Sequence, residues 1–339
     1  MSSAWWEWTL DPRALACGAT FVCTSLLARL APRLGWVDCA DGGRKQQREP
    51  LPLVGGASIA VGLGVAAALG AAEWGWGDLR SLPEWPQSLS SPWSLAALAV
   101  AFVVGWIDDV LPGGLRPAAK LVGQALCGSL AAGALIAAGA WLPAIFVIGA
   151  AFVALNALNT FDNADGAAAG ISVLALAGPL PVAACAVLGF LPFNLRRADE
   201  RALFGRLPRA ILGDSGSHLL GMLILLTPVA WPALTLPLLD LARVAIERMR
   251  NGQAPWVGDR RHLAHRLQAR GLSPAAVALA LALIAFPSVG LGAILESSPG
   301  VETALGSALT ALLFSAATLL SAPRGRPSDA ESAELGLEA

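Results

Sequence analysis

Long apolar runs separated by short polar segments follow one another along almost the whole chain. About 20 apolar residues in a helix cross the ~30 Å hydrocarbon core of a bilayer, so the pattern predicts an all-α, polytopic membrane protein. Eleven candidate helices lie at 14–34, 51–72, 93–111, 118–139, 141–158, 166–180, 181–195, 214–230, 231–249, 274–296 and 302–321. Prolines interrupt 166–195 and 214–249, and since proline marks kinks as well as boundaries, ten helices are the alternative.

The pattern predicts one transmembrane domain at 1–321 and a disordered cytosolic tail at 322–339, which is rich in Ser, Glu and Ala. The composition agrees: 55% of the 339 residues are hydrophobic and 14% are charged, against about 25% charged in soluble domains. The 23 basic and 24 acidic residues nearly balance, which argues against nucleic acid as a partner. Five cysteines have no regular spacing and indicate buried thiols, not disulfides or zinc ligands.

Basic residues are distributed unevenly between the two predicted sides. With eleven spans and an external N-terminus, every Lys and Arg except Arg13 and Arg80 belongs to the inner segments or their helix ends. Because positive charge favours the cytosolic side, we expect the N-terminus outside. The cytosolic segments would be 35–50, 108–120, 156–166, 196–213, 243–273 and the tail.

The segment Asn156 to Gly166, which reads NALNTFDNADG, places carboxylates and carboxamides at the end of an apolar run. A charged side chain inside a bilayer costs about 2.5–3.5 kcal/mol, so Asp162 and Asp165 call for a cation or a polar substrate. Gly166 lets the backbone turn and approach a ligand closely. An ordinary polar loop is the alternative for this segment alone, but two further acidic stretches favour a site.

The first of these, Asp108-Asp109, ends the third predicted span. Adjacent carboxylates repel, and the helix dipole disfavours acids at a C-terminal end, so a bound cation is favoured over a solvated helix end. Lys120 begins the next span, as a snorkelling anchor or as a phosphate ligand.

The second is Asp214 in the segment GDSGS at 213–217. Small residues at a helix start leave N–H groups free for an anion, and the aspartate can hold the metal that accompanies a diphosphate. A plain helix N-cap is the alternative. His218, which follows, is expected to be packed or hydrogen-bonded and not a ligand.

A basic arm, DRRHLAHRL at 259–267, lies in the longest inner segment. Asp259, His262 and Arg266 would share one helical face, with His265 nearby. Zinc would need more convergent ligands. The arm is therefore predicted to clamp a phosphate or a sugar, with a solvated amphipathic connector as the alternative.

Together these motifs predict Mg²⁺-dependent phosphoryl-group transfer at the cytosolic membrane surface, with one substrate from the cytosol and the other from the bilayer. A cation-coupled transporter is the alternative class, but its acids are expected near mid-bilayer. An inactive scaffold relative would be expected to have lost an acid. A CDP-alcohol phosphotransferase is disfavoured because Asp165-Gly166 is followed by three alanines and no arginine.

The motifs, in their order, resemble the polyprenyl-phosphate N-acetylhexosamine-1-phosphate transferase family (glycosyltransferase family 4). The similarity runs from about Gly35 to Leu267, and the arm resembles the undecaprenyl-phosphate GlcNAc-1-phosphate transferase branch more than the related phospho-MurNAc-pentapeptide translocase. Any one motif is weak, but seven in sequence are highly specific. Besides Asp108-Asp109, Gly213 to Ser217 and the arm, they are Asp38 with Arg44-Lys45 and Pro52 to Gly56, Lys120-Leu121 with Gln124, Asn156 through Gly170, and Phe190 to Asn194.

The resemblance implies transfer of a sugar 1-phosphate, GlcNAc 1-phosphate in the first instance, from a UDP-sugar to undecaprenyl phosphate. UMP would be released on the cytosolic face of the inner (plasma) membrane, initiating envelope polysaccharide synthesis. A phospho-MurNAc-pentapeptide transferase or another UDP-N-acetylhexosamine donor is the alternative. The implied cofactor is Mg²⁺, with Mn²⁺ as an alternative; the partners are both substrates and membrane lipids, and a homodimer is left open.

The resemblance also implies residue roles. Asp214, with Asn159 or Asp162, would hold Mg²⁺, and the catalytic acids would be Asp108, Asp109 and Asp162, of which Asp108 or Asp109 orients or deprotonates the lipid phosphate. Substrate contacts are implied for Lys120, Asn156, Asp165, Asn194, Ser217, Arg260, His262, His265, Arg266, Arg44 and Lys45.

Five features depart from the family pattern: Gln47, Ala167, Ile211, Ala264 and about ten extra residues around 197–206. Ile211 replaces an aromatic residue, which weakens any expectation of base stacking. The acids are intact, so these changes bear on the identity of the donor sugar.

Overall fold

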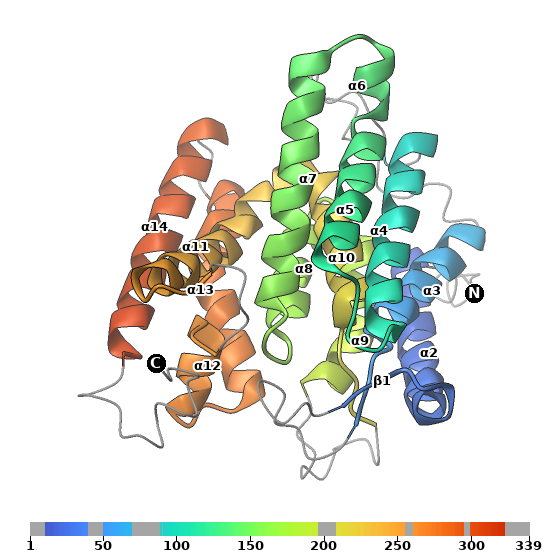
Figure 1. Cartoon of the computed structure of the whole chain (residues 1–339), viewed down its shortest axis with the longest axis horizontal. Helices are drawn as coiled ribbons and strands as arrows, with labels where there is room; N and C mark the ends of the chain where they lie inside the picture. Colours follow the sequence, from blue (N-terminus) through green and yellow to red (C-terminus); the bar gives the residue numbers. More distant parts are fainter. Residues whose placement is uncertain are drawn as a thin grey trace, which may run out of the picture.

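The computed structural model describes residues 11–39, 50–69, 89, 91–195, 208–254, 260–294 and 299–322. Over these ranges the chain is almost entirely helical (Figure 1). The helices are α2 (Pro12–Leu34), α3 (Gly55–Ala68), α4 (Pro92–Val110), α5 (Pro117–Ala131), α6 (Gly133–Ala137), α7 (Trp141–Phe161), α8 (Ala167–Leu176), α9 (Pro181–Asn194), α10 (Gly213–Leu225), the 3-10 helix η3 (Pro228–Leu234), α11 (Thr235–Arg250), α12 (Leu263–Ala269), α13 (Pro274–Ile294) and α14 (Pro299–Leu320).

Five helical segments within the described ranges are long and apolar enough to cross a membrane. They are α2, α4, α7, the continuous η3–α11 segment, and Thr303–Leu320 of α14. Shorter apolar helices include α3, α8, α9 and Pro274–Gly290 of α13. The chain is therefore a multi-pass membrane protein, as predicted, while the count of eleven spans stays a prediction.

Several predicted boundaries differ from those of the structure: the run at 51–72, for example, becomes β2 (Leu51–Pro52) and α3 (Gly55–Ala68). The run at 118–139 divides at Ala132 into α5 and α6. The run at 141–158 extends to Phe161, which keeps Asn159 in the last turn of α7. The run at 214–230 ends as α10 at Leu225, because the prolines of η3 lack the N–H that an α-helix needs. The tail from 323 lies outside the described residues.

Helix α10 lies inside the bundle, packed against α3, α4 and α7. All of its residues are buried except Asp214. Small residues permit this close packing: a Cβ on Gly105 of α4 would fall against the carbonyl of Asp214, and one on Gly56 of α3 against the backbone of Ser215 and Gly216. The packing thus brings the start of α10 against the last two turns of α4.

A two-stranded antiparallel pair, β1 (Val37–Asp38) and β2 (Leu51–Pro52), is an addition to the all-α prediction. The N–H of Ile211 donates to the carbonyl of Pro52 at 2.9 Å, and the N–H of Gly55 donates to the carbonyl of Ile211 at 3.1 Å. These bonds anchor the segment that leads into α10. Figure 1 shows β1, α12 and the turn after α7 at the same end of the bundle.

Candidate functional site

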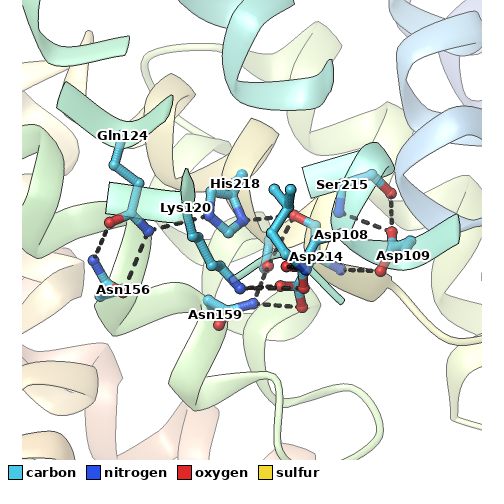
Figure 2. A network of polar contacts seen from close by, with 11 residues as sticks. Asp108, Asp109, Lys120, Gln124, Asn156, Asn159, Asp214, Ser215 and His218 are labelled. Atoms are coloured by element: carbon cyan, nitrogen blue, oxygen red, sulfur yellow. Dashed lines mark hydrogen bonds and ion pairs between the residues drawn. The ribbon is translucent and has the colours of Figure 1, made fainter. Parts of the chain in front are cut away.

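Asp214 lies at the centre of a polar network formed by the end of α4, the start of α5, the end of α7 and the start of α10 (Figure 2). One carboxylate oxygen of Asp214 accepts a hydrogen bond from Asn159 Nδ2 at 2.7 Å. The other forms an ion pair with Lys120, whose Nζ also lies 3.3 Å from Asp108 Oδ2. The ammonium group of Lys120 thus lies between two carboxylates that are 106 residues apart in sequence.

The carboxylate of Asp214 does not cap its own helix, since α10 has no side-chain cap. Asp109 performs that task from α4. Its carboxylate accepts the N–H of Asp214 at 2.8 Å, the N–H of Ser215 at 3.0 Å and the hydroxyl of Ser215 at 2.7 Å. The first N–H groups of a helix have no partner within the helix, so Asp109 satisfies them from the neighbouring helix. Its predicted role toward the lipid phosphate stays a prediction.

Two glycines make room for Asp109. Gly105 lies one turn earlier on the same face of α4, where it allows the backbone of α10 to approach. Gly213 has a φ of 75°, which favours glycine, and a Cβ there would lie 2.7 Å from Asp109 Oδ2. A side chain at either position would move the acid and the helix apart.

Asp108 is held by the turn that follows α4. The N–H of Leu115 donates to Asp108 Oδ1 at 2.8 Å, which leaves Oδ2 facing Lys120. Gly113 and Gly114, with φ of 81° and 73°, allow the backbone to fold back over the carboxylate.

Asp162 and Asp165 lie in the turn between α7 and α8. Desolvation raises the pKa of Asp162 well above its ordinary value, and the negative charges of Asp214, Asp165 and Asp109 raise it further. Desolvation also raises the pKa of Asp165, although an ion pair with Arg209 opposes this effect. Asp162 is therefore a carboxyl group that favours a bound proton or cation. Arg209 was not predicted; its only sequence signal is a basic residue five positions before Asp214.

The buried side-chain amide of Asn194 connects two of the segments that carry the acids. Asn194 Oδ1 accepts the N–H of Gly166 at 2.8 Å, and its Nδ2 donates to the carbonyl of Ala210 at 3.2 Å. Asn194 is buried and links the turn after α7 to the segment before α10. Since both of its polar groups have backbone partners, the structure gives Asn194 a supporting position, and its contact with substrate stays a prediction.

A second series of polar contacts links the backbone of Asp214 to Asn156. Asn156 and Gln124 exchange amide hydrogen bonds of 2.9 and 3.3 Å. Gln124 Nε2 lies 3.3 Å from His218 Nε2, and His218 Nδ1 lies 2.8 Å from the carbonyl of Asp214. Ser217 Oγ is 3.2 Å from Asn159 Nδ2. His218 is fully buried, which confirms the expectation of a hydrogen-bonded, packed histidine.

The basic arm differs from its prediction in one respect. His262 does not share a helical face with Arg266, because it is extended (φ −58°, ψ 149°) and α12 begins only at Leu263. The physical reason is Asp240 of α11, which accepts hydrogen bonds from the His262 ring and from the N–H of Leu263. Asp259, Arg44, Lys45 and Gln47 lie outside the described residues.

The other residues of the arm also have partners. Arg266 pairs with Glu247 at 3.2 Å, and His265 Nδ1 lies 3.3 Å from Gln268 Oε1. Desolvation lowers the pKa of His265 to about 4, and the charge of Arg260 acts in the same direction. His265 is therefore a neutral ring at physiological pH. Helix α12 packs against α13 and α14.

The donor atoms of the central network suit a hard cation shared with a substrate. Within the described ranges, no three His, Cys, Asp or Glu side chains converge as a metal-binding group. Mg²⁺, however, is commonly held by one or two carboxylates together with water and substrate phosphates. Asp162, which lies in the field of the Asp214 and Asp109 carboxylates, and Asp214 itself offer two such carboxylates, and Asn159 adds an amide.

The fold is that of a multi-pass membrane protein, and its polar network forms a site of carboxylate and carboxamide side chains where the ends of four helices meet. Residues 92–231 match the family model described as Glycosyl transferase family 4. This match over part of the chain agrees with the resemblance drawn from the motifs.

Named relatives agree with this match. The undecaprenyl-phosphate alpha-N-acetylglucosaminyl 1-phosphate transferase of Escherichia coli is 24% identical over 307 residues, covering 78% of each chain. The decaprenyl-phosphate N-acetylglucosaminephosphotransferase of Mycobacterium tuberculosis is 29% identical over 332 residues, covering 78% of this chain and 76% of its own. The protein of the same name from Mycolicibacterium smegmatis is 26% identical and covers 92% and 88%.

Proposed function

We propose that this protein transfers a sugar 1-phosphate, GlcNAc 1-phosphate in the first instance, from a UDP-sugar to undecaprenyl phosphate. The reaction would take place at the cytosolic face of the inner membrane, release UMP and initiate envelope polysaccharide synthesis. The observation that carries the proposal is the meeting of Asp108, Lys120 and Asp214 at the ends of α4, α5 and α10. The similar proteins named above are polyprenyl-phosphate sugar phosphotransferases.

The chemistry explains why such a network is needed. An oxygen of the lipid phosphate attacks the phosphorus that carries the sugar, and a new P–O bond forms. The bond from this phosphorus to the bridging oxygen breaks, and UMP leaves with that oxygen. Both reactants are anions, so bringing them together requires positive charge near the reacting phosphorus.

The chain's residues can supply and balance this charge. Asp214 and Asp162, with Asn159, would hold Mg²⁺ or Mn²⁺; when bound, the ion would neutralise diphosphate oxygens. Lys120 lies beside Asp214 and Asp108, from where its ammonium can move to a phosphate oxygen once a substrate enters. Asp108 would orient the lipid phosphate or accept its proton.

Further contacts follow from the family pattern. Asp165, which is paired with Arg209, would bind the nucleotide. The arm residues Arg260, His262, His265 and Arg266 would bind the diphosphate or the sugar, as would Arg44 and Lys45. Asn156, Asn194 and Ser217 would hold the site in shape or contact the substrates.

The position of the acids disfavours the transporter alternative. Asp108 and Asp109 end α4, Asp162 follows α7, and Asp214 begins α10. Acids of an ion pathway are expected near the middle of the bilayer. Among transferases, phospho-MurNAc-pentapeptide and other UDP-N-acetylhexosamines are the competing donors.

The test is a reconstituted reaction. Purified protein in nanodiscs is incubated with Mg²⁺, undecaprenyl phosphate and UDP-GlcNAc, UDP-GalNAc or UDP-MurNAc-pentapeptide, and both UMP and the lipid product are measured. We expect turnover with one donor and none with Asp214→Asn. Asp11→Asn, at the cap of α2, is the matched control and should stay active. Absence of UMP with every donor, in Mg²⁺ and in Mn²⁺, would refute the proposal.

A further inference from the structure

Asp240 is a fully buried acid that none of the predicted motifs contains. It lies in α11, within the candidate membrane span Pro228–Arg250, and its exposed fraction is 0%. Such a residue marks a functional position by default, because a buried carboxylate in a span is costly. Its partners show what it does.

The two oxygens of Asp240 have different partners. Oδ1 accepts the N–H of Leu263 at 3.1 Å and Arg243 Nη2 at 3.0 Å. Oδ2 lies 2.8 Å from His262 Nδ1. Arg243 also donates to the carbonyl of Arg261 at 2.6 Å. The carboxylate of Asp240 therefore holds the start of α12 through the N–H of Leu263, and it holds the ring of His262 through Nδ1.

This geometry determines which nitrogen of the His262 imidazole carries the proton. An ionised carboxylate only accepts hydrogen bonds, so Nδ1 of His262 carries the proton. In the neutral ring the other nitrogen, Nε2, then offers a lone pair.

We propose that Asp240 is a positioning residue that orients His262 and fixes its tautomer, so that Nε2 accepts a hydrogen bond from a hydroxyl or N–H group of the nucleotide sugar. The inference rests on the proposed function in one respect, the nature of this ligand. The Asp240–His262 geometry itself stands independently of it.

The substitution Asp240→Asn tests the tautomer with little change in shape. The Asn oxygen would stay with Leu263 N–H and Arg243, which both donate hydrogen bonds. The Asn amino group would then face Nδ1 of His262 and donate to it. Nδ1 must become an acceptor, so the proton moves to Nε2 and the lone pair offered to the ligand is lost.

The first measurement is the ¹⁵N spectrum of histidine-labelled protein at high pH, where neutral rings are observed. The chain has three histidines, so substitution of each one assigns its signals. We expect Nδ1 of His262 to be protonated in the native protein and Nε2 in the Asp240→Asn variant. A bare Nδ1 in the native protein would overturn the inference, even where the variant fails to fold.

The second measurement is a double-mutant cycle on UMP release. We expect Asp240→Asn to lower kcat/KM for the UDP-sugar roughly 10- to 100-fold, as loss of a histidine's outer partner does at metal sites, with little effect on KM for undecaprenyl phosphate. In a His262→Gln background it should cause no further loss. Independent, multiplicative losses would show a merely structural role and refute the inference. Asp240→Glu, which keeps the carboxylate, should recover part of the activity.

The two measurements separate the two proposals. Failure of the native protein to release UMP from any donor refutes the proposed function, while the histidine spectrum still tests the role of Asp240. Conversely, an active native enzyme whose His262 signals are the same in Asp240→Asn refutes the inference alone.

Discussion

Replacing Asp109 with alanine should remove activity and also weaken the fold, because Asp109 caps α10 from the neighbouring helix. Its carboxylate accepts two backbone N–H groups and one hydroxyl at 2.7–3.0 Å. In Asp109→Ala the N–H groups of Asp214 and Ser215 lose their acceptor. The start of α10, which carries Asp214, is then released.

The cost follows from the groups left without partners. A buried N–H that loses its acceptor costs about 1–3 kcal/mol, and loss of a helix N-cap costs about 0.5–2 kcal/mol. Asp109 keeps some exposed surface, so water can replace part of the lost bonding. We therefore expect a destabilisation of about 2–3 kcal/mol. Asp109→Asn retains one acceptor oxygen and should cost less.

The assay compares thermal unfolding in detergent with UMP release. Asp109→Ala should lower both the Tm, by several degrees, and the activity. Asp214→Ala should abolish activity with a smaller effect on Tm, since the Asp214 side chain caps no helix. An unchanged Tm in Asp109→Ala would contradict the capping argument, whatever the activity.

Three further predictions concern packing, metal and pH. Gly105→Ala should lower both Tm and activity, because its Cβ would meet the backbone of Asp214, whereas Gly64→Ala, with open space around it, should change neither; equal behaviour of the two variants would contradict the packing argument. Chelation of divalent ions should stop UMP release and added Mg²⁺ should restore it; full activity in excess chelator would contradict the proposed cofactor. The pKa of His265 is lowered to about 4, so between pH ~6.5 and about 4 only the unfolded state binds a proton at this ring. The free energy of unfolding therefore decreases as the pH decreases through this window. His265→Gln should show a smaller loss of Tm on acidification over this window, and an identical loss would contradict the assignment.

Local apolar pattern predicted the long helices well. The expected spans at 14–34 and 93–111 correspond to α2 at 12–34 and α4 at 92–110 within two residues. The strands β1 and β2 have two residues each, too few for any periodicity to indicate them. The segment before α10 joins them only in the fold, through the bridge of Ile211 with Leu53.

The polar residues that meet at the start of α10 could be named from the sequence, but the contacts that each of them makes could not. Asp108 and Asp109 look equivalent side by side, yet one faces Lys120 and the other caps a helix whose N–H groups lie 105 and 106 residues away. Asp240 was missed because an acid followed by Arg243 and Glu247 resembles the polar face of an ordinary amphipathic helix. Only the fold shows that its partner is His262.

The short length of α10 sets it apart from the membrane-crossing helices around it. Thirteen residues span only about 20 Å as an α-helix, whereas the hydrocarbon core is ~30 Å thick. A helix this short cannot reach from one membrane surface to the other, and protein surrounds it on every side. The helices packed around α10, among them the candidate spans α4 and α7, must therefore supply the rest of the membrane thickness.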